Sequence, residues 1–371
     1  MEGMTKTIAL LPGDGIGPEV IFAAASLLED CGTEFGHRFE LVEFPLGGAA
    51  IDRCSTPLPP ETLEGCLTAD AILLGAVGGP RWDALPLGKR PESALLGLRK
   101  KLDLYANLRP ICLHESLGTI SPLKLERTRK IDFEIVRELA GGLYFGTHRV
   151  ESENGVERAF DDITYSTAEV ERVARFAFAR AEARSKRLTS VDKANVLATS
   201  VLWRKTVERL AADYPEVSVQ HLYVDNAAMQ LVLAPEQFDV ILTSNMFGDI
   251  LSDGAAALAG SIGLIPSMSW GFGPPLFEPI HGSAPTLVGQ DRACPIGAIL
   301  CTSMMLRQAF GLSAEAEWIE SAVDHVLARG YRTPDIADVN SSVVGCSEFV
   351  ALVRAEMQAS VKQQEPYGWG V

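Results

Sequence analysis

The chain lacks long apolar runs and a surplus of positive charge, and both absences narrow its function. No apolar run is long enough to cross a bilayer, and the one in MEGMTKTIALL is too short for a secretory leader, so we expect neither. Lysine and arginine number 33 against 48 acidic residues, which gives a net charge of -15 and an isoelectric point near 4.9. Nucleic acids and anionic membranes repel such a chain, so we expect neither as a partner.

Cysteine is scarce and has no metal or redox spacing. The seven cysteines are odd in number and form no CxxC motif. This pattern predicts reduced thiols and a cytoplasmic location. The composition, with 47% apolar and 22% charged residues, is that of a globular protein, and 371 residues are many for one compact core. We therefore expect two domains.

The common nucleotide-binding fingerprints are also missing. An apolar run at residues 7–11 is followed by PGDGIG and then by a helix that begins near Pro18. These glycines do not fit GxGxxG and no GK[ST] follows, so the motif alone favours a tight turn over a phosphate cradle. A second apolar strand is expected at residues 71–77, after a helix near residues 60–67. Apolar strands without alternation, placed between helices, are typical of a buried parallel or mixed sheet.

Two acids four residues apart are the first candidate for chemistry. Asp249 and Asp253 follow a predicted strand at residues 240–242 and project from one face of the next helix. On an arbitrary helix such a pair most often marks a solvated face. Here Ile250 and the alanines at 255–257 predict a mostly buried helix, in which unpaired carboxylates are costly. A hard divalent cation such as Mg²⁺ would relieve their repulsion.

An arginine shares a predicted helical stripe with apolar residues. Arg99 falls on the same side as Glu92, Leu95 and Leu96, so this face has the mixed character of a pocket wall. Arg109 follows in a segment that Pro110 makes extended. For each of these two arginines a surface ion pair is the ordinary alternative.

A third arginine is harder to assign to the surface. Arg137 lies inside the predicted strand IDFEIVREL, where a guanidinium needs a buried or cleft-bound anion. Gly141 and Gly142 then bend the chain toward Tyr144, whose ordinary role would be a core ring with its hydroxyl at the surface. Farther on, residues 147–164 are predicted to form a polar link. A helix at residues 167–185 has an apolar stripe that fits either the core or a subunit interface.

Two more charged residues follow predicted strands. Lys193 and Asp225 each stand between a strand and a helix, where open α/β sheets place their chemistry. Most lysines are solvated, so only this position singles out Lys193. Asp225, Asp249 and Asp253 would provide three oxygen ligands, which suits an octahedral Mg²⁺ or Mn²⁺ that keeps room for substrate oxygens.

A series of motifs along nearly the whole chain carries a family resemblance. In order they read LLPGDGIGPEV, LLGAVGGPRW, ANLRP, IVRELAGGLYFG, SVDKANVL, YVDNAAMQL, TSNMFGDILSD and EPIHGSAP. The chain resembles the isocitrate/isopropylmalate dehydrogenase family of metal-dependent β-decarboxylating dehydrogenases. The resemblance implies a two-domain α/β fold with a mixed sheet and a non-Rossmann cofactor site. Residues 1–104 plus 260–371 would form the cofactor-binding domain, and residues 105–259 the domain for metal, substrate and dimerisation.

The resemblance also implies a role for each candidate residue. The three arginines would hold two substrate carboxylates, and Lys193 and Asp225 would enter the site from the partner of a homodimer. The implied catalytic residues are Tyr144 and Lys193; the substrate-binding residues are Glu92, Leu95, Leu96, Arg99, Arg109, Arg137, Val196 and Asp225; and the metal ligands are Asp225, Asp249 and Asp253.

The implied reaction is oxidative decarboxylation of (2R,3S)-3-isopropylmalate to 4-methyl-2-oxopentanoate with reduction of NAD, a step of leucine biosynthesis. An apolar wall of Leu95 and Leu96 rejects a further carboxylate but distinguishes alkyl groups by only about 1–3 kcal/mol per methylene. A paralogue acting on another 3-alkylmalate or malate derivative therefore remains open. So does a non-catalytic regulatory subunit, although the metal acids, Lys193 and Tyr144 are all present.

The predicted cofactor segment, EPIHGSAPTLVGQDRACP, departs from the family pattern. Thr286 stands where the family usually has an acid that binds ribose, and Cys294 replaces an asparagine expected at adenine. The lysine of NADP-using relatives is absent too, although Arg292 could meet a phosphate, so we favour NAD over NADP. Gly254 replaces a glutamate usual beside the second metal acid. The implied cofactor-binding residues are Gly78, Glu278, His281, Gly282, Ser283, Ala284, Pro285, Thr286, Leu287 and Cys294.

Overall fold

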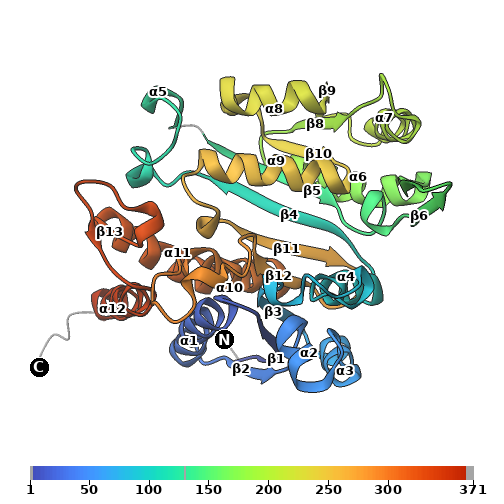
Figure 1. The fold of residues 1–371 in the computed structure, drawn as a ribbon. Coiled ribbons are helices and arrows are strands. Elements are labelled where there is room, and N and C mark those ends of the chain that lie inside the picture. The colour runs from blue at the N-terminus through green and yellow to red at the C-terminus, as the bar shows by residue number, and fades with distance from the viewer. Residues whose placement is uncertain (1–2, 129–130, 365–371) are drawn as a thin grey trace, which may run out of the picture.

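The computed structural model describes residues 3–128 and 131–364, which are organised around one ten-stranded mixed sheet (Figure 1). Its strand order is β2-β1-β3-β12-β11-β4-β5-β10-β8-β9. The strands are β1 (Thr5–Gly13), β2 (Arg38–Glu43), β3 (Ala71–Ala76), β4 (Leu104–Cys112), β5 (Asp132–Glu138), β8 (Arg187–Asp192), β9 (Ser218–Tyr223), β10 (Val240–Thr243), β11 (Pro266–Gly271) and β12 (Leu276–Pro279). Two short sheets pair β6 (His148–Glu153) with β7 (Val156–Asp161) and β13 (Tyr331–Arg332) with β14 (Ser342–Val343).

Helices cover both faces of the large sheet, and the predicted α/β fold with a mixed sheet is confirmed (Figure 1). The α-helices are α1 (Gly17–Phe35), α2 (Gly47–Cys54), α3 (Pro60–Thr68), α4 (Glu92–Lys101), α5 (Leu125–Thr128), α6 (Thr167–Glu182), α7 (Ala198–Ala211), α8 (Val224–Leu233), α9 (Asn245–Leu258), α10 (Ile296–Ala309), α11 (Ser313–Ala328) and α12 (Cys346–Gln364). The 3-10 helices are η1 (Pro80–Trp82), η2 (Leu87–Lys89), η3 (Glu115–Leu117), η4 (Leu143–Phe145), η5 (Pro235–Gln237), η6 (Ile262–Leu264), η7 (Pro285–Leu287) and η8 (Pro334–Ile336). Among these helices none has the length and apolar character that a bilayer span requires.

The strand directions change near the middle of the sheet. The neighbours β12, β11, β4 and β5 pair antiparallel, whereas the strands outside them pair parallel. Strands β1, β2, β3, β11 and β12 come from the two ends of the chain, and the other five come from its middle. This arrangement agrees with a discontinuous first domain, but the boundaries at 104/105 and 259/260 stay a prediction.

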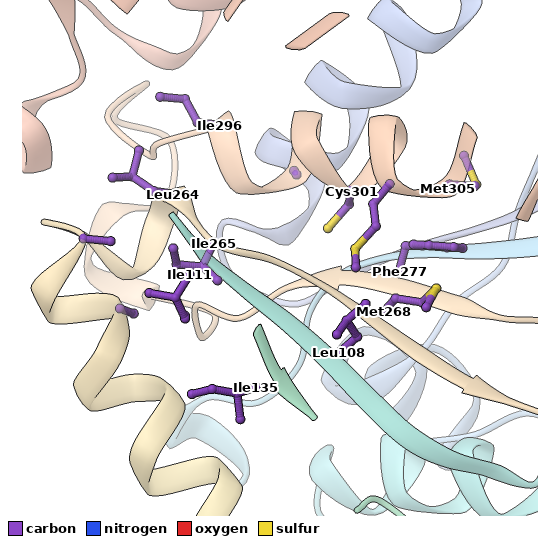
Figure 2. Packing of buried hydrophobic residues seen from close by; sticks show 14 of the residues in the cluster. Leu108, Ile111, Ile135, Leu264, Ile265, Met268, Phe277, Ile296, Cys301 and Met305 are labelled. Carbon is purple, nitrogen blue, oxygen red and sulfur yellow. The ribbon is translucent and has the colours of Figure 1, made fainter. Parts of the chain in front are cut away.

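One face of the central strands is apolar. Leu108 of β4 pairs with Met268 of β11, which pairs with Phe277 of β12, and residues paired in this way point to the same face of a sheet. These side chains are buried beside Cys301 and Met305 of α10 (Figure 2). Because each buried side chain of this size stabilises the fold by about 1.5–3 kcal/mol, α10 is fixed firmly to the sheet. The opposite face of the same strands is free to carry polar residues.

Two expectations about the middle of the chain are decided by the structure. The prediction of a polar link at residues 147–164 is wrong, because this segment contains the β6–β7 hairpin. The hairpin turns at Asn154 and Gly155, whose φ values are 52° and 78°. The residues of the hairpin are almost all exposed, so the sequence has little apolar alternation from which its strands could be predicted. The apolar stripe of α6 belongs to the core, because Val170, Val173 and Phe178 are fully buried within this chain.

Candidate functional site

A cleft of about 370 Å³ lies over the polar face of the central strands. Residues from α4, β4, β5, η4, α9 and the end of β12 line it, and most of them were predicted as site residues. Its charged and polar lining includes Glu92, Arg99, Arg109, Arg137, Tyr144, Asp249, Ser267, Glu278 and His281; its apolar lining includes Val77, Leu95, Leu96 and Ile280. The structure thus brings the three predicted arginines and Tyr144 together.

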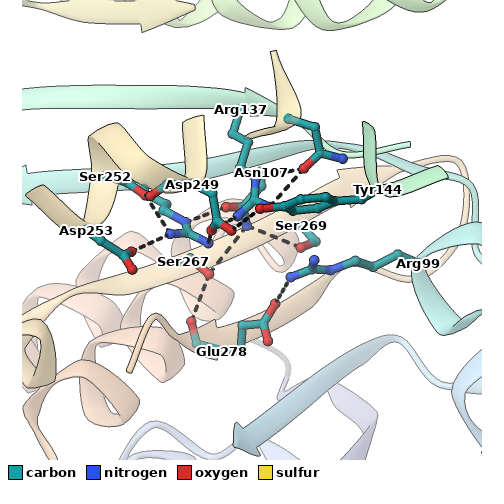
Figure 3. A network of polar contacts seen from close by, with 12 residues as sticks. Arg99, Asn107, Arg137, Tyr144, Asp249, Ser252, Asp253, Ser267, Ser269 and Glu278 are labelled. Carbon is teal, nitrogen blue, oxygen red and sulfur yellow. Dashed lines mark hydrogen bonds and ion pairs between the residues drawn. The ribbon is translucent and has the colours of Figure 1, made fainter. Parts of the chain in front are cut away.

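The register of the sheet explains why these polar residues meet. Arg137 of β5 pairs with Asn107 of β4, and Asn107 pairs with Ser269 of β11. Ser267, two residues before Ser269, pairs with Glu278 of β12. Since paired residues share a face, a polar row crosses four strands (Figure 3). A sequence pattern within single strands does not reveal such a row, because it depends on how the strands align.

Asp249 is the centre of the charged network. Its Oδ1 accepts a short hydrogen bond from Arg137 Nη1 and lies 3.5 Å from Arg109 Nη2. The Tyr144 hydroxyl donates to Oδ2 at 2.9 Å. Arg109 Nη1 also donates to Asp253 Oδ1 at 3.3 Å. Within the chain, arginines therefore already balance the two acids that were expected to need a cation.

The burial expected for α9 is only partly right. Leu251, Ala255 and Ala256 are buried, but Ile250 is 62% exposed and the Asp253 side chain is 55% exposed. Helical spacing predicted the two faces of α9 but not which of them would be covered. The argument for a cation from the cost of burial is therefore weaker for Asp253 than the sequence suggested.

The surroundings set the charge states of these groups. Burial raises the pKa of Asp249, but Arg137 and Arg109 outweigh it and hold that pKa below its ordinary value. For Asp253 burial prevails over Arg109, and the pKa is raised. Burial and the nearby Asp249 raise the pKa of Tyr144. Burial and Arg109 lower the pKa of Arg137 to about 10. At neutral pH Arg137 is thus charged, Asp249 ionised and Tyr144 able to donate a proton.

Arg99 and Glu278 form a buried pair on the other side of the cleft. Arg99 Nη2 donates to Glu278 Oε1 at 2.7 Å. Arg99 Nε is buried and has no hydrogen-bond partner among the residues that the structure describes. The predicted cofactor residue Glu278 thus contacts a predicted substrate arginine. Gly78, another predicted cofactor residue, lies against Glu92, and a Cβ there would come within 2.6 Å of Glu92 Oε1.

Asp14 is an important residue that the sequence motifs did not predict. Its buried carboxylate accepts hydrogen bonds from the backbone N–H groups of Gly48 at 2.8 Å, Ala49 at 2.7 Å and Gly78 at 2.8 Å. The signal was an aspartate between Gly13 and Gly15, since aspartate in a tight turn commonly binds nearby backbone N–H groups. The PGDGIG motif is therefore a structural clamp that holds the edge of the cleft.

The predicted cofactor segment runs from the cleft along this clamp. Ser283 O accepts from the N–H of Ile16 at 2.8 Å. His281 is buried at the cleft, with Nδ1 2.9 Å from the carbonyl oxygen of Gly282, and its Nε2 lacks a hydrogen-bond partner in the described part of the chain. Burial lowers the pKa of His281, so the ring is neutral at pH 7. An unpaired ring nitrogen that lines a cleft suits a polar ligand such as a nucleotide.

The two departures in this segment lie in different surroundings. Thr286, in η7, is exposed and could reach a ligand. Cys294 is buried. A Cβ added at Gly263 would come within 2.8 Å of the Cβ of Cys294. Burial raises the pKa of the Cys294 thiol far above its ordinary value, so the group is an unreactive thiol.

Three of the predicted catalytic and substrate-binding residues lie outside the cleft of this chain. Lys193 and Asp225 form a short ion pair after β8 and β9, and neither lines the cleft within the described chain. Val196, close to Lys193, is 71% exposed. The single chain therefore brings Asp249 and Asp253 together, but not Asp225. Aspartate oxygens on one helix face are suitable donors for a hard divalent cation, and a third donor has to come from elsewhere.

Comparisons with known proteins cover nearly the whole chain. A family model described as isocitrate/isopropylmalate dehydrogenase matches residues 7–353. The 3-isopropylmalate dehydrogenase of Bacillus licheniformis is 56% identical over 337 residues, 90% of this chain and 91% of the relative. That of Geobacillus kaustophilus is 54% identical over 350 residues, 94% of each chain. That of Moorella thermoacetica is 54% identical over 352 residues, 95% of this chain and 99% of the relative.

Solved structures show the same architecture. The isocitrate dehydrogenase from Methylococcus capsulatus superposes with a TM-score of 0.86 at 32% identity, over 95% of this chain and 99% of that one. A β-decarboxylating dehydrogenase from Thermococcus kodakarensis, in its apo form, superposes with a TM-score of 0.78 at 37% identity, over 99% of both chains.

Proposed function

Because the chain belongs to the isocitrate/isopropylmalate dehydrogenase family, we propose that it oxidatively decarboxylates (2R,3S)-3-isopropylmalate to 4-methyl-2-oxopentanoate, with reduction of NAD, in leucine biosynthesis. One observation carries this proposal: three arginines and an apolar wall share one cleft. The guanidiniums of Arg99, Arg109 and Arg137 fit two carboxylates, since their fork geometry matches that group.

The apolar wall favours an alkylmalate over isocitrate. Leu95 and Leu96 lie on the α4 side of the cleft, where they would contact the group at C3 of a malate. A carboxylate placed against them would lose its hydration without gaining a cation. The 3-isopropylmalate dehydrogenases at 51–56% identity support the same choice.

A divalent cation and NAD complete the proposed site. Asp249, Asp253 and Asp225 of the partner subunit would hold Mg²⁺ or Mn²⁺, and His281 with the segment 282–287 would contact the nucleotide. When bound, the cation supplies Lewis acidity at the substrate oxygens and the nicotinamide accepts a hydride. We favour NAD over NADP because no lysine stands at position 286.

The chain's own residues would then orient the substrate and move its protons. The arginines hold both carboxylates and so set which C–C bond is aligned to break. Lys193 of the partner subunit accepts the proton of the C2 hydroxyl as the hydride leaves. After CO₂ departs, Tyr144 donates its proton to C3. The Arg137 guanidinium, 5.6 Å from the centroid of the Tyr144 ring, keeps the proton donor beside the carboxylate clamp.

The proposal includes a homodimer in the cytoplasm. Exposed apolar residues occur on α7, α8 and α9 and next to Lys193: Val196, Val201, Met229, Val232, Leu233 and Ile250. A second copy of the chain that covers them would bring its Lys193 and Asp225 to the cleft. The seven free cysteines agree with a reducing compartment. We also keep the two domains, 1–104 plus 260–371 and 105–259, as part of this proposal.

Absorbance of NADH formed from 3-isopropylmalate, Mg²⁺ and NAD tests the function. We expect turnover that EDTA abolishes and that is weaker with isocitrate. A higher kcat/KM with another 3-alkylmalate would reassign the substrate, and an NADP preference above about tenfold would reverse the cofactor choice. If metal binds but neither cofactor supports turnover, the chain is better described as a regulatory subunit.

A further inference from the structure

Asn245 uses every polar group of its side chain behind the cleft. It is the first residue of α9 and is 1% exposed. Its Oδ1 accepts from Arg137 Nε at 3.0 Å and from Nη2 at 2.8 Å. Its Nδ2 donates to the carbonyl oxygen of Gly141 at 3.1 Å. One amide thus touches both the predicted carboxylate clamp and the turn that leads to Tyr144.

The turn itself is held from its other side. Glu138 is fully buried and accepts from the N–H groups of Ala140 at 2.8 Å and Gly141 at 3.0 Å. The Tyr165 hydroxyl accepts from the N–H of Asn245 at 3.0 Å. It also leaves no room at Gly142, where a Cβ would come within 2.3 Å of Tyr165 Oη. The path of the chain into η4, and so the place of Tyr144, has little freedom.

We propose that Asn245 is a positioning residue that fixes Arg137 and the Tyr144 turn relative to each other. Its oxygen accepts hydrogen bonds from Nε and Nη2 of Arg137. Nη1 of Arg137 is then directed at Asp249 in the cleft. Its amide N–H₂ fixes Gly141, three residues before Tyr144. Asn245 does not itself line the cleft, so it acts through these two residues. The inference rests on the proposed function, in which Arg137 binds substrate and Tyr144 donates a proton.

Two substitutions separate the two contacts. Asn245→Asp keeps an oxygen for Arg137 but replaces the donor to Gly141 with a second acceptor, which repels the carbonyl. Asn245→Ala removes both contacts. For Asn245→Asp we expect a substrate KM within about threefold of the parent but kcat lower by about tenfold or more, because the proton donor is misplaced. For Asn245→Ala we expect KM to rise by about tenfold as well.

A solvent deuterium isotope effect on kcat gives an independent readout. It should increase in Asn245→Asp, because proton donation by Tyr144 becomes slower than the other steps. A purely structural role would not change it. Thr206→Val is the matched control: it removes a buried hydroxyl from α7, which donates to Leu202 O at 2.8 Å, and should leave KM, kcat and the isotope effect unchanged.

The outcomes distinguish the two proposals. A parent enzyme without turnover refutes the proposed function, and the positioning role fails with it. If the parent shows turnover, the proposed function stands and the variant tests the positioning role. That role is refuted if Asn245→Asp changes KM and kcat in equal proportion, or if it lowers only the melting temperature. If Asn245→Ala does not fold, Asn245→Asp still decides, since it preserves the size and the bond to Arg137.

Discussion

The carboxyl of Glu138 is buried, and its titration makes the stability of the protein depend on pH. Burial raises its pKa from 4.5 to about 6, although two backbone N–H bonds oppose this. A carboxyl whose pKa is higher in the folded protein contributes stability that is full below pH 4.5 and is lost as the pH rises through 6. The loss amounts to about 2 kcal/mol.

Glu138→Gln should remove that dependence. Urea unfolding between pH 4 and 7 should show that the free energy of unfolding of the variant, relative to that of the parent, increases by about 2 kcal/mol as the pH rises. Equal slopes for both proteins across this range would show that Glu138 does not titrate there.

Asp14 should matter for stability and for the cleft edge at once. Asn at this position offers one acceptor oxygen where the aspartate serves Gly48, Ala49 and Gly78. We expect Asp14→Asn to lower the free energy of unfolding by about 1–3 kcal/mol, since buried N–H groups lose their partner. The KM for NAD should rise too, because Gly78 borders the proposed cofactor site. Denaturant unfolding and cofactor titration measure both effects, and a change below about 0.5 kcal/mol would contradict the clamp.

At the scale of single elements, α9 contains two glycines with opposite surroundings. A Cβ at Gly254 would meet no atom of the described residues within 4 Å, whereas a Cβ at Gly248 would come within 2.6 Å of Arg137 Cγ. Gly254→Ala should therefore raise the free energy of unfolding by about 0.5–1 kcal/mol, because alanine restricts the unfolded chain. Gly248→Ala should destabilise the protein and raise the substrate KM. Melting curves and steady-state kinetics test the pair. Destabilisation by Gly254→Ala would contradict the open space around position 254.

Elements with a strong apolar pattern were predictable, and elements that depend on partners were not. Strands β3 and β10 and helices α4 and α6 follow from local sequence. The β6–β7 hairpin was missed because exposed polar strands have no apolar alternation, although Asn154-Gly155 was a hairpin signal. The motif resemblance located the arginines and Tyr144. It could not reveal Asn245 as the support of Arg137, because that contact joins β5 to the start of α9, 108 residues farther along the chain.

At the scale of the whole molecule, the proposed site is shared between two copies of the chain. Tyr144 lies in the cleft of its own chain, whereas Lys193 lies outside it, paired with Asp225. Tyr144→Phe and Lys193→Ala should each be nearly inactive as homodimers. In a mixed dimer, however, one cleft combines the intact Tyr144 of one chain with the intact Lys193 of the other. Co-refolding equal amounts should therefore restore about a quarter of parent activity, since about half of the dimers are mixed and each has one complete site.

Size and mixing controls make this test decisive. Light scattering of each variant should give the mass of a dimer, because the substitutions leave the apolar surface of α7, α8 and α9 intact. Mixing without unfolding should restore activity only as fast as subunits exchange. If the co-refolded mixture is dimeric yet no more active than its components, Lys193 acts within its own chain. The ion pair of Lys193 with Asp225 would then have to open and close over the cleft of the same subunit.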